Sequence, residues 1–100
     1  MVIVGGTFEM EPGQREQFLA GRLEMMRVSR AEAGCLEYTF APDPIEPGRV
    51  VLFERWESQE ALDAHLVALR AGPMPDESPI GPIRSSLTIY DVSGERKLGR

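Results

Sequence analysis

A change of hydrophobic period within residues 50–69, VVLFERWESQEALDAHLVAL, places a strand directly before a helix. Val50–Phe53 is a continuous apolar run with β-branched residues, which predicts a strand buried on both faces. The residues after it repeat at i, i+3, i+4 and i+7, the spacing of one helical face: Leu62, His65, Leu66 and Leu69. The only histidine of the chain is therefore predicted to lie on the apolar stripe of a helix, facing the sheet.

Both ends of this helix carry recognisable signals. Ser58 is placed as an N-cap, and Glu60 complements the dipole of the first turn. Gly72 and Pro73 form a stop signal. An inward-facing histidine on such a helix is either a satisfied core residue or the working part of a pocket, and both interpretations stay open at this point.

The remaining elements follow from local patterns. Strands are predicted over Val2–Met10, Cys35–Ala41 and Ser86–Val92, and a helix from Glu11 to about Glu32. Gly5-Gly6 suggests a bulge or the close approach of a ligand to the backbone. The first helix is expected to bury one side and keep the other in water; the buried side is Phe18, Leu19, Leu23, Met26 and Val28, and the hydrated side is Arg15, Glu16, Arg22 and Arg27.

Alternation in the second strand predicts that Leu36, Tyr38 and Phe40 share one face. Residues 42–48 are rich in proline and are expected to form a long hairpin loop. Residues 72–82 carry four prolines and two glycines, and we expect them to be irregular and to lie over the end of the sheet.

The order strand, helix, strand, strand, helix, strand predicts an α+β fold with the ferredoxin-like βαββαβ arrangement and an antiparallel sheet. Two right-handed crossovers place both helices on one face of this sheet. The opposite face is then bare, although the first and third strands are apolar on both sides. A second copy packed sheet against sheet is the simplest cover, so we expect a homodimer of the dimeric α+β barrel type.

Length and charge limit the remaining choices. One hundred residues make a single domain, expected over residues 1–92, with a polar tail over 93–100. A net charge of -5 argues against nucleic acid and anionic membranes as partners, and no apolar run is long enough to span a bilayer. The N-terminus MVIVGG lacks the features of a secretory signal. The single cysteine, Cys35, excludes an internal disulfide and fits the reducing cytoplasm.

Two separated stretches resemble one known family. SRAEAGCLEY, residues 29–38, resembles the helix-to-strand junction of the antibiotic biosynthesis monooxygenase domain family. ERWESQEALDAHL, residues 54–66, resembles that family's second signature, a tryptophan at the end of a strand followed by a helix with a histidine. The resemblance implies a dimeric α+β barrel. It also implies cofactor-free oxidation of phenols or quinols by dioxygen or, in one branch, haem degradation.

The sequence also departs from this family. A second histidine that many members carry after the helix is missing, since the chain reads HLVALRAGPMPDE. The haem-degrading branch uses an asparagine, a tryptophan and that later histidine, none of which has a counterpart here. The quinone-forming members rely on an asparagine, and this chain contains no asparagine. We therefore expect no haem and no other cofactor.

A cofactor-free oxidation of this kind needs a base, aromatic walls and a contact that stabilises the phenolate. His65 is the candidate base, because an imidazole with the ordinary pKa of ~6.5 is half-neutral around physiological pH. The other candidates are aromatic walls from Trp56, Tyr38 and Phe53, an anion contact from Arg84 or Tyr90, and Glu54 as a group that orients His65. Each also has a plainer interpretation: core or interface packing for the aromatic residues, and solvated positions for Arg84 and Glu54.

Other chemistries have weaker support. No spacing pairs Cys35 with His65 as a nucleophile, and one histidine among scattered carboxylates is not a convincing metal set. Two classes of function stay open. One is a small cofactor-independent monooxygenase acting on a quinol or polycyclic phenol. The other is a non-catalytic dimeric barrel that binds a small aromatic or hydrophobic molecule or assists another enzyme.

Overall fold

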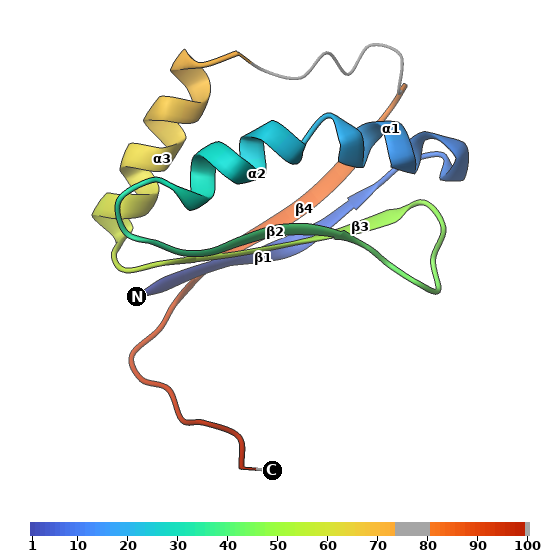
Figure 1. Cartoon of the computed structure of the whole chain (residues 1–100). Coiled ribbons are helices and arrows are strands. Elements are labelled where there is room, and N and C mark those ends of the chain that lie inside the picture. Colours follow the sequence, from blue (N-terminus) through green and yellow to red (C-terminus); the bar gives the residue numbers. More distant parts are fainter. Residues whose placement is uncertain (74–80, 100) are drawn as a thin grey trace.

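The computed structural model describes residues 1–73 and 81–99. Four strands and three helices follow one another as β1, a short 3-10 turn, α1, α2, β2, β3, α3 and β4 (Figure 1). Their bounds are β1 Val2–Glu9, the 3-10 turn Pro12–Gln14, α1 Arg15–Ala20, α2 Leu23–Arg30, β2 Cys35–Pro42, β3 Arg49–Trp56, α3 Gln59–Ala71 and β4 Arg84–Asp91.

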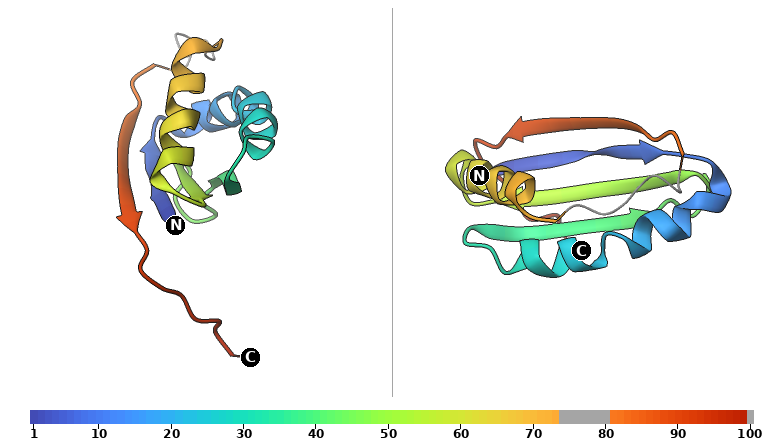
Figure 2. Two further views of the ribbon diagram at one scale, coloured as in Figure 1. Left: turned by 90° about the vertical axis from the view of Figure 1, so that its left-hand side faces the viewer. Right: turned by 90° about the horizontal axis from the view of Figure 1, so that it is seen from above.

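The four strands form one antiparallel sheet in the order β2-β3-β1-β4 (Figure 2, right). The central strand β1 pairs with β3 from Val2 opposite Trp56, and with β4 from Val2 opposite Asp91. All helices lie on one side of the sheet (Figure 1). The expected ferredoxin-like α+β architecture is therefore confirmed.

The core lies between the helices and the face of the sheet that they cover. Alternate residues of β1, β2 and β3 point into it, and each helix adds at least one buried side chain: Val2, Val4, Tyr38, Phe40, Val50, Leu52 and Trp56 from the strands, and Phe18, Met26 and Leu62 from the helices. The rings of Phe18 and Phe40 meet edge to face, with centroids 6.1 Å apart. This contact packs α1 against β2.

Helix α3 forms as the sequence predicts. The Ser58 hydroxyl accepts a hydrogen bond from the Ala61 amide at 3.1 Å, and the helix ends before Gly72. Leu62 and His65 are buried, while the positions between them face water. The apolar stripe thus turns the histidine toward the sheet, as expected.

The first helical region departs from the prediction of one helix from Glu11 to Glu32. It is divided into a 3-10 turn, α1 and α2, with a break at Gly21 and Arg22. Glycine weakens a helix at such a point because it gives up more backbone freedom than other residues. The break also re-aims the side chains that follow it.

Arg22, expected to face water, is 6% exposed. Its guanidinium carbon lies 3.6 Å from the centre of the Phe18 ring, a cation–π contact, and burial lowers the pKa of Arg22 to about 10. Leu23 and Val28, expected to be buried, are exposed instead. The prediction for these three residues was wrong because it assumed a single straight helix with one continuous apolar face.

Two details of the strands also differ from the prediction. The pairing of β2 with β3 shifts between Cys35 and Glu37, and this irregularity leaves Leu36 exposed rather than on the face of Tyr38. Gly5-Gly6 lies in regular pairing rather than a bulge. Gly6 is required because a side chain there would collide with the Ser86 carbonyl of β4. Strand packing, not a ligand, explains this glycine.

The last strand begins two residues earlier than predicted, so Arg84 belongs to β4 and not to a loop. Residues 74–80 of the expected irregular segment lie outside the described residues. In the part of the chain that is described, no helix is long and apolar enough to cross a membrane.

The face of the sheet opposite the helices is partly apolar, as the two-sided strands predict. Val51 and Phe53 on β3 alternate with buried neighbours and remain 39% and 37% exposed. Tyr90 on the edge strand β4 is exposed as well, and its ring lies beside Gly5 on β1. We call this surface, made by Ile3, Val51, Phe53 and Tyr90, the open face.

Candidate functional site

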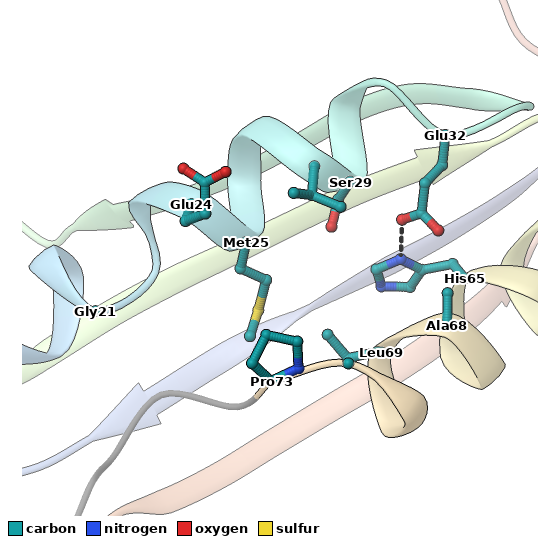
Figure 3. A pocket seen from close by; sticks show the side chains of 11 residues that line it. Gly21, Glu24, Met25, Ser29, Glu32, His65, Ala68, Leu69 and Pro73 are labelled. Atoms are coloured by element: carbon teal, nitrogen blue, oxygen red, sulfur yellow. Dashed lines mark hydrogen bonds and ion pairs between the residues drawn. The ribbon is translucent and has the colours of Figure 1, made fainter.

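A cavity of about 310 Å³ lies between α2 and α3, and its volume suits a small organic ligand (Figure 3). Its walls are mostly apolar. The described lining residues are Gly21, Glu24, Met25, Val28, Ser29, Glu32, His65, Ala68, Leu69, Gly72 and Pro73. Three polar side chains gather at one end of the pocket: Ser29, Glu32 and His65.

His65 and Glu32 form the central contact of this end. The Nδ1 atom of His65 lies 2.7 Å from the Glu32 carboxylate, a short distance that is typical of a charge-assisted hydrogen bond (Figure 3). The His65 side chain is 2% exposed, whereas that of Glu32 is 23% exposed. The prediction that His65 faces a pocket is therefore confirmed, and the more accessible partner is the carboxylate.

Aromatic rings hold the imidazole on its inner side. The Trp56 ring lies 4.6 Å from the His65 ring between centroids, at 33°, and the Tyr38 ring meets it edge to face at 5.2 Å. The Tyr38 phenol in turn shares a hydrogen bond with the Ser29 hydroxyl. These rings leave the imidazole little freedom to rotate.

A second carboxylate lies on the other side of the imidazole. Trp56 Nε1 donates a hydrogen bond to Glu54 Oε1 at 3.0 Å, and the same oxygen lies 3.9 Å from His65 Nε2. Burial raises the pKa of Glu54, against the opposing effects of the Trp56 hydrogen bond and the His65 charge, while the Glu32 charge raises it further. Burial and the nearby Glu54 charge likewise raise the pKa of Tyr38 well above its usual range, so this phenol stays neutral.

The environment of Cys35 disfavours a reactive thiolate. Burial raises the pKa of its thiol, and the carboxylates of Glu32 and Glu54 raise it further. The described residues contain no group of three or more histidine, cysteine, aspartate or glutamate side chains that could hold a metal ion.

The structure brings four of the predicted site residues together and places three elsewhere. His65, Trp56, Tyr38 and Glu54 form one connected buried cluster. Phe53, Arg84 and Tyr90 point to the opposite side of the sheet, since they alternate with residues that face the helices. Arg84 is exposed there and pairs with Glu9 at 3.4 Å. The substrate-binding role of these three residues stays a prediction.

Sequence reasoning missed Glu32 and Ser29. Both belong to the stretch SRAEAGCLEY, but no local pattern pairs Glu32 with a histidine 33 residues later. Gly34 is the sequence feature that comes nearest to predicting this contact. Its φ of 81° turns the chain sharply between α2 and β2, and this turn brings the end of α2 against α3.

The fold and the pocket define a class of protein: a ferredoxin-like α+β domain with an apolar pocket in its helical layer. The sequence model described as antibiotic biosynthesis monooxygenase matches residues 1–68. The chain therefore belongs to the antibiotic biosynthesis monooxygenase family, and the resemblance of its two motifs is confirmed.

Individual proteins match this chain at low sequence identity. An uncharacterised protein of Synechocystis is 34% identical over 64 residues, which cover 64% of this chain but only 44% of that protein. YcnE of Bacillus subtilis, whose name describes it as a candidate monooxygenase, is 28% identical over 65 residues that cover 65% of this chain and 68% of the relative. A solved structure from Deinococcus radiodurans covers 100% of both chains with a TM-score of 0.81 at 21% identity, and this likeness shows the fold alone.

Proposed function

We propose that the helix pocket binds a quinol or polycyclic phenol and that the protein oxidises it with dioxygen, without a flavin or metal. The observation that carries this proposal is the Glu32–His65 pair: a buried imidazole in a 2.7 Å contact with a carboxylate that lines an apolar cavity. Membership of the antibiotic biosynthesis monooxygenase family and the name of YcnE support the same class of reaction.

The pair would act as the general base. A hydroxyl group of the ligand reaches the Glu32–His65 pair, which takes up its proton, and the phenolate that remains is a much better electron donor than the phenol. Dioxygen is a triplet and reacts slowly with closed-shell molecules, so this activation is the step that the protein needs to supply. Apolar walls from Met25 and Leu69 keep water away from the anion.

The overall reaction balances for an anthrone-type substrate. Its CH₂ group loses two hydrogen atoms and becomes a carbonyl; one oxygen atom of O₂ enters the product, and the other leaves as water with these two hydrogens. The substrate gives up four electrons and dioxygen accepts four. No external reductant is therefore required.

Within this proposal Trp56 and Tyr38 orient the imidazole rather than form the outer wall of the pocket, and Glu54 stabilises its protonated form from the Nε2 side. The working unit would be a homodimer in the cytoplasm, with the open face as the contact between the two copies.

A binding protein without catalytic activity is the second candidate. The observation that favours it is the absence of asparagine from the chain, since the quinone-forming members that the sequence resembles depend on that residue. In this case the same pocket would hold a hydrophobic molecule, and the Glu32–His65 pair would serve only to orient it.

Oxygen consumption distinguishes the oxidising enzyme from the binding protein. It is measured on the purified protein, free of flavin and metal, with a panel of anthrones and quinols. We expect the wild type to accelerate oxygen uptake, and both His65→Ala and Glu32→Gln to lower the rate by about 10²–10⁴-fold, the usual contribution of general base catalysis. Glu60→Gln is the matched control, because Glu60 is exposed on the same helix as His65.

Circular dichroism should first establish that each variant is folded, since truncating a buried ring can destabilise the protein. A folded His65→Ala variant that is as fast as the wild type would contradict the role of His65 in the general base. A wild type that turns over no member of the panel, yet binds some of them, would favour the binding protein.

A further inference from the structure

The described pocket wall carries two acidic side chains and, as its basic group, His65. Glu24 and Glu32 are acidic, and no lysine or arginine lies among the described lining residues. The two acids are not equivalent. Glu24 is largely exposed, pairs with Arg27 at 3.3 Å, and points away from His65 in Figure 3. Glu32 alone places a carboxylate at the polar end of the cavity.

The two oxygens of Glu32 have different roles. Oε1 contacts His65 Nδ1. Oε2 has no hydrogen-bond partner among the described residues. His65 itself is almost fully buried, and its Nε2 atom is directed toward Glu54. A ligand that enters the pocket would therefore meet the Glu32 carboxylate before it meets the imidazole.

We propose that Glu32 is the recognition group of the pocket, and that it selects uncharged or cationic aromatic molecules that donate a hydrogen bond and rejects anionic ones. An ionised carboxylate is acceptor-only, so a phenol or an ammonium group satisfies it. A carboxylate ligand would place a second negative charge beside Glu32 in a partly buried site, where the described lining has no lysine or arginine and His65 is already paired with Oε1.

This inference rests on the proposed function only in taking the helix pocket as the binding site. It adds a ligand class that the fold and the family do not specify. A substrate with a free carboxylate near its reactive ring would be excluded, and a neutral quinol accepted.

Three probes with the same two rings test the selection: 2-naphthol, which is a neutral donor, 2-naphthylmethylammonium, which is a cationic donor, and 2-naphthoate, which is an anion without a donor. We would measure their dissociation constants for the wild type by calorimetry at pH 7 under argon. Naphthol and the ammonium are expected to bind at least 30-fold more tightly than naphthoate.

The variant Glu32→Gln should change this order, because its amide can donate a hydrogen bond and carries no charge. We expect at least tenfold weaker binding of the ammonium and at least tenfold tighter binding of naphthoate. Glu60→Gln, which removes an exposed carboxylate from α3, should leave all three constants unchanged.

Equal binding of naphthoate and naphthol to the wild type would overturn the proposal, as would failure of all three probes to bind. An unchanged order in a folded Glu32→Gln variant would also overturn it, and the wild-type series decides the matter if that variant does not fold. Argon keeps the test separate from oxidation. A protein that binds in the expected order but consumes no oxygen with quinols contradicts only the proposed reaction.

Discussion

At the scale of single residues, the imidazole of His65 lies between two carboxylates of different character. Glu32 is within hydrogen-bonding distance and reaches the cavity. Glu54 is buried and accepts a hydrogen bond from the Trp56 indole. The raised pKa of Glu54 means that the folded protein holds this proton more tightly than the unfolded chain does.

This shift sets the direction of a pH effect on stability. The contribution of Glu54 protonation is present at low pH and is lost as the pH rises from the ordinary glutamate value through the raised folded-state value. Glu54→Gln keeps an acceptor for Trp56 and removes the titration. We therefore expect the free energy of unfolding of this variant, relative to the wild type, to increase with pH.

Urea unfolding between pH 4 and pH 8 measures this difference, and Glu60→Gln is the exposed control. Wild-type and Glu54→Gln curves that stay parallel across the whole range would show that Glu54 has no raised pKa in the folded protein.

Cys35 gives a second prediction at this scale. Burial and the neighbouring carboxylates of Glu32 and Glu54 raise its thiol pKa, so the reactive thiolate is scarce near neutral pH. Because the chain has one cysteine, alkylation by iodoacetamide reports on this site alone. We expect the folded protein to react at least tenfold more slowly at pH 8 than the same protein in urea; equal rates would contradict the raised pKa.

At the scale of elements, the junction between α2 and β2 positions the pocket. Gly34 has a φ of 81°, and a side chain added there would lie 2.6 Å from the Cβ of Ala61 on α3. Gly81 has nearly the same φ, 82°, but nothing within 4 Å of an added Cβ. The two glycines therefore separate the effect of backbone strain from the effect of packing.

Gly81→Ala should lower the free energy of unfolding by about 1 kcal/mol, the strain of a left-handed residue. Gly34→Ala should lower it by about 3 kcal/mol, because overpacking against α3 adds to the same strain. Chemical denaturation of both variants measures the difference. Equal losses would mean that α3 is not held against the junction.

At the scale of the whole molecule, the described helices leave the apolar open face uncovered. Its apolar residues come from the three adjacent strands β3, β1 and β4, while the helices cover only the other side (Figure 2, left). Contiguous apolar surface of this kind usually marks an interface.

We therefore predict a homodimer that forms through this face. Light scattering coupled to gel filtration should give about twice the chain mass of 11.1 kDa at micromolar concentration. Val51→Asp should shift the protein to monomer, because it places a charge in the open face. The matched control is Val67→Asp: Val67 is 65% exposed on α3, away from this face. A wild type of 11.1 kDa would contradict the prediction.

The sequence alone determined the features that depend on neighbours along the chain. The strand-to-helix switch at residues 50–69, the Ser58 cap and the inward position of His65 follow from side-chain period and capping, and the structure confirms them. The element order then restricts the fold to the ferredoxin-like class, because crossover handedness leaves few alternatives.

Only the tertiary structure decided which groups meet across long separations. Glu32 contacts His65 over 33 residues, Arg22 turns inward at a helix break, and Leu36 is displaced by an irregularity in the β2–β3 pairing. Local pattern cannot predict these outcomes, since each depends on what a second element presents at that point. The buried histidine was therefore readable from the sequence, but the carboxylate that makes it a candidate site was not.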